Sequence, residues 1–259
     1  MYLNAAIEDN YAYNSMPDRH TKLQTFDRFL HSIQEKLRPD LLFIACNTLS
    51  ALFHDTYFDH QRHIPVQGIV HSGVRIMLAA YENEKDTHFI VFATPTTVEE
   101  AIYSKLLQEH GVPANQVVEQ ACPGLPDAIS NDSSGYLAIE LLKKFVPAAL
   151  ARMENPSGHV AAFLGCTHYG YQSAEFENVL QRLVPGARVL NPNHVATDSI
   201  LSLLNTKPGE GCLKVGFYTR YRIPKVVMDS LSDYIGDRAP ATLSALRNYS
   251  YSPELCGEL

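Results

Sequence analysis

Short apolar runs rich in β-branched residues alternate along the chain with longer amphipathic stretches. This alternation is typical of βαβ units, in which helices connect the strands of a parallel sheet. The pattern predicts strands at 41–45, 65–70, 88–93, 116–121, 159–165, 187–190 and 214–218. It predicts helices at 21–36, 73–81, 97–108, 134–149, 172–183, 196–204 and 226–234, the third beginning with Glu99 and Glu100 in its first turn. The expected fold class is α/β with doubly wound parallel sheets.

Two of the predicted strands lead directly into a cysteine. The run 41–44 is followed by Ala45-Cys46-Asn47-Thr48, and the run 160–164 by Gly165-Cys166-Thr167-His168-Tyr169. Each cysteine therefore lies where a strand gives way to a helix, at the sheet edge where open α/β proteins bind ligands. Free amides and the positive end of a helix dipole favour a thiolate there, so we expect both thiols to lose a proton more easily than usual.

The two cysteine segments share an order of residue types: apolar residues, a small residue, cysteine and a polar residue. This similarity, although short enough to arise by chance, indicates two related halves that each supply one thiol. A thiolate and a thiol on opposite sides of a carbon can remove a proton from one face and replace it on the other. For that chemistry, we expect the two sulfurs to lie roughly 6–9 Å apart across a cleft.

Each of these residues also has an ordinary structural interpretation. A cysteine at the end of a buried strand is more often a small apolar residue in the core. An Asn or Thr after a strand is commonly a helix N-cap, and a lone histidine is commonly structural. The matching contexts of Cys46 and Cys166 favour the chemical interpretation for this pair. For Cys122, and for Cys212 and Cys256, which lack polar neighbours, we expect a packing or surface role.

Composition narrows the function classes. The 259 residues carry a net charge of −7, which argues against nucleic-acid and membrane partners. The five cysteines form no CxxC pair and the histidines no HxxxH pair, which argues against a disulfide framework, a zinc site and metal binding. The first ten residues lack the basic start and apolar stretch of a signal peptide, so the expected location is the cytoplasm.

The two cysteine strings together closely resemble the paired signatures of glutamate racemase, in the cofactor-independent aspartate/glutamate racemase superfamily. The His-Tyr after Cys166-Thr167 favours the glutamate branch. Further segments resemble the family in the same order along the chain: Ala12-Tyr13-Asn14, Pro65-Val66-Gln67-Gly68-Ile69, Ala93-Thr94-Pro95-Thr96-Thr97-Val98 and Ala121-Cys122-Pro123.

The resemblance implies two α/β domains related by a pseudo-two-fold axis, with the active site between them. The first would comprise 1–69 plus 189–259 and carry Cys46, and the second would comprise 70–188 and carry Cys166. It implies an isomerase without cofactor or metal that interconverts L- and D-glutamate for peptidoglycan. The oligomeric state is left open, with a homodimer as one expectation. By motif position, Cys46 and Cys166 are the acid/base thiols and His168 assists Cys166, while the substrate contacts are Asn47, Thr48 and Thr167, with Tyr13 and Thr97 lining the pocket.

Two carboxylates of the family pattern have no counterpart at the expected positions. The family's first strand carries an Asp-Ser-Gly turn, whereas Met1 falls about where the second strand is expected. We expect either a start upstream of Met1 or a replacement by residues 1–7, with Glu8 or Asp9 as the acid. The carboxylate nine residues beyond Ala121 is replaced by Ser130-Asn131, and Asp132 is the nearest acid in that region.

These departures leave three functional hypotheses. The first is a working glutamate racemase. The second is a racemase-like protein, catalytically impaired, that binds a ligand or a partner. The third is a racemase or isomerase of a related compound, such as aspartate, a hydantoin or maleate, against which the Thr167-His168-Tyr169 string argues.

Overall fold

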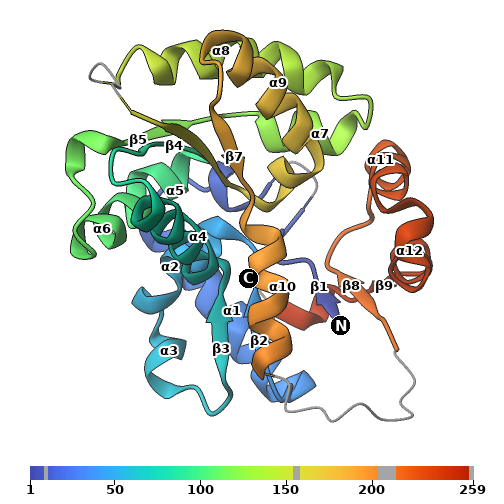
Figure 1. Cartoon of the computed structure of the whole chain (residues 1–259). Coiled ribbons are helices and arrows are strands. Elements are labelled where there is room, and N and C mark those ends of the chain that lie inside the picture. The colour runs from blue at the N-terminus through green and yellow to red at the C-terminus, as the bar shows by residue number, and fades with distance from the viewer. Residues whose placement is uncertain (9–10, 154–157, 204–213, 257–259) are drawn as a thin grey trace. The chain divides into compact units, whose positions relative to one another are not determined.

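The computed structural model describes residues 1–8, 11–153, 158–203 and 214–256 (Figure 1). It divides into two compact units. Unit 1 comprises 1–42, 52–66 and 206–259, and unit 2 comprises 43–51 and 67–205. Both units combine helices with parallel strands, so the predicted α/β class is confirmed.

Unit 2 is built on a parallel sheet of four strands in the order β5-β4-β6-β7. Its two central strands, β4 and β6, are buried at every position. Helices α7, α8 and α9 cover one face of the sheet, and α4 and α6 cover the other (Figure 1). Burial on both faces explains why these strands appear in the sequence as continuous apolar runs. The strands are β4 (His88–Ala93), β5 (Val117–Ala121), β6 (Val160–Gly165) and β7 (Arg188–Leu190).

The chain order reverses between β4 and β6. From β4 the chain continues to β5 on one side, and from β6 it continues to β7 on the other. The carboxyl ends of β4 and β6 lie side by side, since Ala93 is the ladder partner of Gly165. In open α/β sheets, ligands bind outside the strand ends at such a switch point. We therefore expect a ligand site of unit 2 to be formed by the residues that follow Ala93 and Gly165.

The stretches predicted at 73–81, 134–149, 172–183 and 196–204 overlap helices of unit 2, the short helices at 47–52 and 125–131 were not predicted, and the stretch 97–108 needs a correction. The helix expected over 97–108 is two helices, because Ala101 adopts a left-handed conformation with φ of 50°. The first of the two begins at Pro95, a residue that suits the first helical position, so Glu99 and Glu100 end that helix instead of opening it. The helices are α2 (Asn47–Leu52), α4 (Ile69–Asn83), α5 (Pro95–Glu100), α6 (Ile102–Glu109), α7 (Leu125–Asn131), α8 (Tyr136–Leu150), α9 (Ser173–Leu183) and α10 (Pro192–Leu203).

Two segments that were predicted to lie in the first domain belong to unit 2. Helix α10 packs along α4, where the Arg75 guanidinium donates to the Ser199 hydroxyl at 2.9 Å. The segment 43–51, which carries Cys46, is bound to unit 2 through Asn47 and Thr48, as described below. The strand before it, β2 (Leu42–Ile44), pairs only with β3 (Val66–Gly68) among the described strands.

Unit 1 contains a parallel sheet in the order β1-β8-β9. Residues 2 and 3 form its strand β1, in register with Phe217 and Tyr218. The long helix of the unit, α1, begins after Asp18, whose carboxylate accepts a hydrogen bond from the Thr21 amide at 2.7 Å. The elements are β1 (Tyr2–Leu3), β8 (Phe217–Thr219), β9 (Ser250–Tyr251), α1 (Arg19–Leu37), α3 (Tyr57–Gln61), α11 (Lys225–Ile235) and α12 (Pro240–Arg247).

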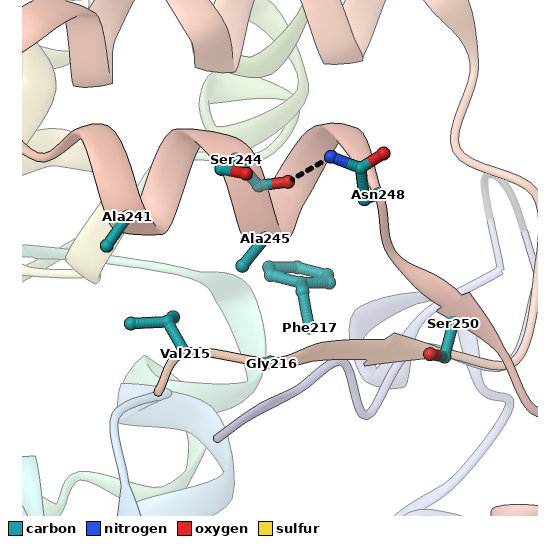
Figure 2. A pocket seen from close by; sticks show the side chains of 8 residues that line it. All are labelled: Val215, Gly216, Phe217, Ala241, Ser244, Ala245, Asn248 and Ser250. Carbon is teal, nitrogen blue, oxygen red and sulfur yellow. Dashed lines mark hydrogen bonds between the residues drawn. The ribbon is translucent and has the colours of Figure 1, made fainter. Parts of the chain in front are cut away.

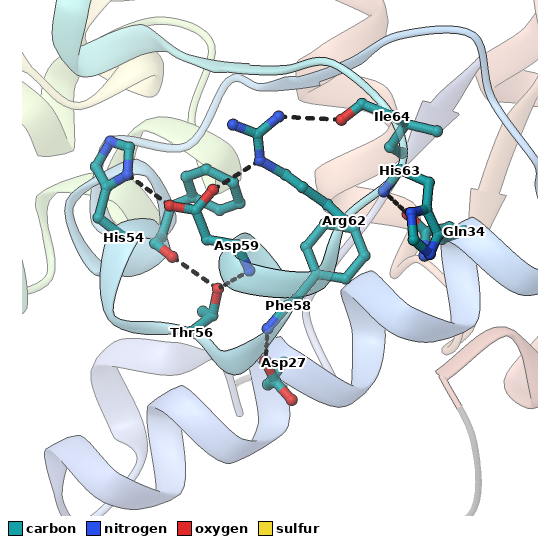
Figure 3. A network of polar contacts seen from close by, with 10 residues as sticks. Asp27, Gln34, His54, Thr56, Phe58, Asp59, Arg62, His63 and Ile64 are labelled. Carbon is teal, nitrogen blue, oxygen red and sulfur yellow. Dashed lines mark hydrogen bonds and ion pairs between the residues drawn. The ribbon is translucent and has the colours of Figure 1, made fainter.

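A polar network joins α3 to α1 within unit 1 (Figure 3). The Asp27 carboxylate accepts from the Phe58 amide at 2.7 Å, and the side-chain Oε1 of Gln34 accepts from the His63 amide at 2.9 Å. Asp59 accepts from Arg62 at 2.7 Å and contacts the His54 ring at 2.8 Å. Burial raises the pKa of Asp59, but these two partners outweigh burial and hold the pKa below its usual value. We assign this network a structural role.

Unit 1 also contains a pocket of about 440 Å³ (Figure 2). One of its wall residues, Asn248, donates to the Ser244 carbonyl at 2.9 Å. The lining holds no ionisable side chain and therefore offers nothing to balance the charges of an amino acid. It also holds none of the predicted site residues. The lining consists of Val215, Gly216, Phe217, Ala241, Ser244, Ala245, Asn248 and Ser250.

The core of unit 2 yields a test of packing at Gly73. A Cβ there would lie 2.6 Å from Phe163 Cζ and 2.9 Å from Tyr103 Cε1, and both rings are fully buried. In an exposed helix Gly→Ala stabilises by about 1 kcal/mol, but overpacking a core costs about 1–3 kcal/mol. We therefore expect Gly73→Ala to lower the free energy of unfolding, measured by urea denaturation.

The matched control is Ala79→Gly, at an exposed position of the same helix. It should cost about 1 kcal/mol through helix propensity alone. If the Gly73→Ala protein were more stable than wild type, the rings of Phe163 and Tyr103 would have to move aside without strain.

Candidate active site

Cys46 lies between a strand and a helix, as predicted. Strand β2 ends at Ile44, α2 begins at Asn47, and the Cys46 carbonyl accepts from the Ser50 amide at 2.8 Å in the first turn. The residue is exposed to solvent. The amides of Thr48 and Leu49 hydrogen-bond to the sulfur and favour its thiolate.

Three threonine hydroxyls fix the start of α2 at the end of β4. Thr48 Oγ1 lies 2.8 Å from Thr94 Oγ1 and 3.2 Å from Thr97 Oγ1, and Thr94 Oγ1 lies 3.0 Å from Thr97 Oγ1. All three residues are buried. The structure thus brings together two predicted substrate contacts, Thr48 and Thr97, at the switch point of the sheet. The third hydroxyl, on Thr94, was not among the predicted site residues.

Cys166 follows β6 on the same edge of the sheet. Its sulfur lies 3.7 Å from His168 Nδ1, and Thr167 and His168 open a 3-10 helix, η4 (Thr167–Gln172). Gly165 is needed before it, because a Cβ there would come within 2.9 Å of the Phe92 carbonyl oxygen. The backbone carbonyl of Thr167 accepts from Asn193 Nδ2 at 3.2 Å, which ties this turn to α10.

Desolvation outweighs the amide hydrogen bonds in its effect on the pKa of both thiols. It raises the pKa of Cys166 to about 12, with a further rise from the negative charge of Cys46, while the amides of His168 and Tyr169 lower it. The surrounding protein likewise raises the pKa of Cys46, although that residue is open to solvent. The prediction that helix amides would make these thiols lose protons more easily is wrong in its net direction. The amides act in the predicted sense, but desolvation of the thiolate outweighs them.

The charge of Cys46 raises the pKa of Cys166, which indicates that both thiols lie in the same part of unit 2, and the predicted separation of the two sulfurs stays a prediction. The histidine beside Cys166 is held neutral, because burial lowers the pKa of His168 below its ordinary value. The candidate active site therefore contains two protonated thiols, a neutral imidazole and a cluster of hydroxyls.

Comparison with known proteins identifies the family. A family model described as Asp/Glu/Hydantoin racemase matches residues 13–200. The chain belongs to this family. The matched range includes both cysteines and the whole sheet of unit 2.

Two glutamate racemases resemble the chain over about half and two thirds of its length. A glutamate racemase of Roseobacter denitrificans is 34% identical over 186 residues, which are 66% of this chain and 64% of the relative. One of Ruegeria sp. is also 34% identical, over 121 residues, 47% of this chain and 42% of the relative. The chain thus spans less than two thirds of the length of these curated relatives.

Solved structures of the family share the fold. Glutamate racemase from Francisella tularensis, crystallised with D-glutamate, superposes with a TM-score of 0.65 at 23% identity, covering 86% of this chain and 79% of that one. The enzyme from Aquifex pyrophilus gives 0.62 at 20% identity, covering 91% and 84%.

One charged residue of the site was missed in the sequence. Asp127 lies in the first turn of α7, which packs against η4. Its charge adds to burial in raising the pKa of Cys166, and it opposes burial at His168. The resemblance places the family's carboxylate nine residues beyond Ala121, whereas Asp127 lies six residues beyond it. Its proximity to Cys166 arises from the packing of α7, which the spacing does not reveal.

Two further residues singled out in the sequence, Tyr13 and Cys122, are buried. Tyr13 is buried in unit 1, where its ring packs edge-on against Phe26 at 6.0 Å, and its place in the pocket stays a prediction. Cys122 is buried, with its sulfur 3.5 Å from the Gln120 carbonyl oxygen, which fits a packing role. Cys212, Asp9 and the side chain of Cys256 lie outside the described residues.

No helix among the described residues is long and apolar enough to cross a membrane. Across the same residues, no group of three or more histidine, cysteine, aspartate or glutamate side chains could hold a metal ion.

Removing the charge of Asp127 should make Cys166 more reactive. In Asp127→Asn the pKa of Cys166 falls, so more thiolate is present at a given pH and alkylation accelerates. Because Asp127 is exposed, we expect an increase of only about twofold, shrinking in 1 M salt. The measurement is the rate of iodoacetamide labelling of the Cys166 peptide at pH 8, followed by mass spectrometry.

Glu140→Gln is the control, since Glu140 is an exposed carboxylate on α8 that pairs with Lys143. It should leave the labelling rate unchanged. An equal labelling rate of Cys166 in Asp127→Asn and wild type would show that the charge of Asp127 does not affect this thiol.

Proposed function

We propose that this chain is a cofactor-independent racemase that interconverts L- and D-glutamate. The observation that carries the proposal is the pairing of Cys46 and Cys166, each after a strand end of unit 2 and within electrostatic reach of the other. Family membership and the names of the relatives described above support glutamate as the substrate.

In the proposed mechanism the α-carbon of the substrate lies between the two sulfurs. One cysteine, as thiolate, takes the α-proton: the C–H bond breaks, an S–H bond forms and the electron pair stays on the carbon. The other cysteine, as thiol, gives its proton to the opposite face, so its S–H bond breaks and a new C–H bond forms. The configuration inverts, and the roles of Cys46 and Cys166 exchange in the reverse direction.

The raised pKa values suit this step. An α-proton of an amino acid is a very weak acid, and a thiolate becomes a stronger base as the pKa of its thiol rises. The free protein holds little thiolate, because the pKa of Cys166 is raised to about 12. The positive ammonium group of a bound amino acid favours the thiolate and so promotes the active form once substrate is present.

The remaining residues bind and orient the substrate in this proposal. Asn47, Thr48 and Thr167 contact it, His168 holds Cys166 in its working protonation state, and Thr97 and Tyr13 line the pocket. The partner is thus a free acidic amino acid, and the product, D-glutamate, would supply peptidoglycan synthesis in the cytoplasm. A homodimer is part of the proposal, to be checked by sedimentation.

Replacing either thiol should abolish racemisation. Cys46→Ala and Cys166→Ala each remove the acid or base of one face, and we expect a loss of about 10³-fold or more in kcat for both directions. Circular dichroism of a glutamate solution follows the reaction. Cys212→Ala and Cys256→Ala are the controls and should stay within about twofold of wild type. Comparable racemisation by Cys46→Ala would contradict the two-thiol mechanism and favour a binding protein or another chemistry.

Deuterium incorporation from solvent distinguishes a racemisation mechanism with two bases from one with a single base. Each thiol exchanges its proton with solvent between turnovers, so in D2O the product formed from either enantiomer should carry deuterium at the α-carbon. The unreacted substrate should stay protiated early in the reaction. Proton NMR of both enantiomers, separated after less than a tenth of full conversion, measures this. Early deuterium in the substrate, or retained hydrogen in the product, would indicate a single base that serves both faces.

A further inference from the structure

The amide of Asn47 has two ends with different environments. The residue is only 2% exposed. Its Oδ1 accepts a hydrogen bond from the Tyr103 hydroxyl at 2.5 Å, at the short limit for O–H···O and below the range of N–H···O. Its Nδ2 is buried and has no hydrogen-bond partner among the described residues. A buried donor without a partner costs free energy, which a bound acceptor restores.

Tyr103 is held in place on every side that the structure describes. The residue is fully buried, and its ring packs against Phe163 with the centroids 4.7 Å apart. Gly73 lies against it, since a Cβ at that position would be 3.1 Å from the hydroxyl oxygen. The ring and its hydroxyl therefore have little freedom to turn away from Asn47.

Tyr103 also lies within electrostatic range of the thiols. Burial raises its pKa well above the ordinary value, and the negative charges of Glu119, Cys166 and Cys46 add to this rise. The hydroxyl therefore stays protonated and keeps its hydrogen to donate.

We propose that Tyr103 is a positioning residue that makes Asn47 a donor-only group in the active site. An asparagine side chain that is free to rotate can present its carbonyl oxygen to an ammonium group or its NH₂ to a carboxylate. It therefore does not distinguish the two ends of an amino acid. Because the hydrogen bond from Tyr103 holds Oδ1 turned toward α6, the unpartnered N–H groups are the end of the amide left for the substrate. Asn47 then selects a carboxylate and fixes which end of the amino acid it receives. The proposal rests on the proposed function, because the ligand is taken to be glutamate.

The experiment is a double-mutant cycle on racemisation, with Tyr103→Phe, Asn47→Ala and the double variant. Tyr103→Phe should raise KM for D-glutamate about tenfold, because Asn47 loses its fixed orientation, and change kcat by less than about threefold. In the Asn47→Ala background the same change should have no further effect on KM. A purely structural role would lower the melting temperature without this dependence on Asn47.

Tyr81→Phe is the control, since the Tyr81 hydroxyl makes one exposed, 3.5 Å contact to the Gly111 carbonyl. Its KM should match wild type. An unchanged KM in Tyr103→Phe, or an equal rise with and without Asn47, would overturn the positioning role while the wild-type enzyme still racemises glutamate. A wild type that binds D-glutamate without racemising it would overturn the proposed function alone, and calorimetric Kd values then complete the same cycle.

A second measurement applies if Tyr103→Phe does not fold. In wild-type protein with ¹⁵N-labelled asparagine, D-glutamate should shift the Asn47 side-chain NH₂ signals and slow their exchange with solvent. Unshifted signals under saturating D-glutamate would overturn the proposal.

Discussion

The hydrogen bonds that attach the Cys46 segment to the parallel sheet are the constraint on which the candidate site depends. Strand β2 is not part of the four-stranded sheet of unit 2, so no backbone ladder to that sheet positions Cys46. Side chains do so instead: Thr48 bonds to Thr94 and Thr97, and Asn47 bonds to Tyr103. These bonds are buried, where hydrogen bonds are stronger and their loss leaves unpaired groups. The relation of one thiol to the other is thus set by a few polar side chains at the switch point.

The same site shows two opposing electrostatic effects on one thiol. Amides at the start of η4 stabilise the Cys166 thiolate, and desolvation destabilises it. Inspection of the strand-to-helix junction reveals only the first effect, since the junction is local. The second effect depends on everything packed around the sulfur, and here it is the larger. The net result is a thiol that stays protonated at neutral pH in the free protein.

The sheet and the positions of both cysteines were predictable because the strands of unit 2 are buried on both faces. β4 was predicted to the residue, and β5, β6 and β7 to within one residue, from their apolar runs. The break at Ala101 was not predictable, because a single left-handed residue leaves the helical period of apolar positions almost unchanged. The roles of Tyr103 and Asp127 were missed for another reason. Both reach the site through packing, Tyr103 from α6 and Asp127 from α7, and sequence spacing carries no record of that proximity.

The raised thiol pKa values have a consequence for the chemical durability of the site. Oxidation to sulfenic acid and reaction with electrophiles both proceed through the thiolate. Cys166, with a pKa raised to about 12, is almost entirely protonated at neutral pH and is therefore a slow target for peroxide. Exposed Cys46 gains the same protection from its own raised pKa. One exposed and one buried cysteine can thus persist in the reduced state because both keep their protons at neutral pH.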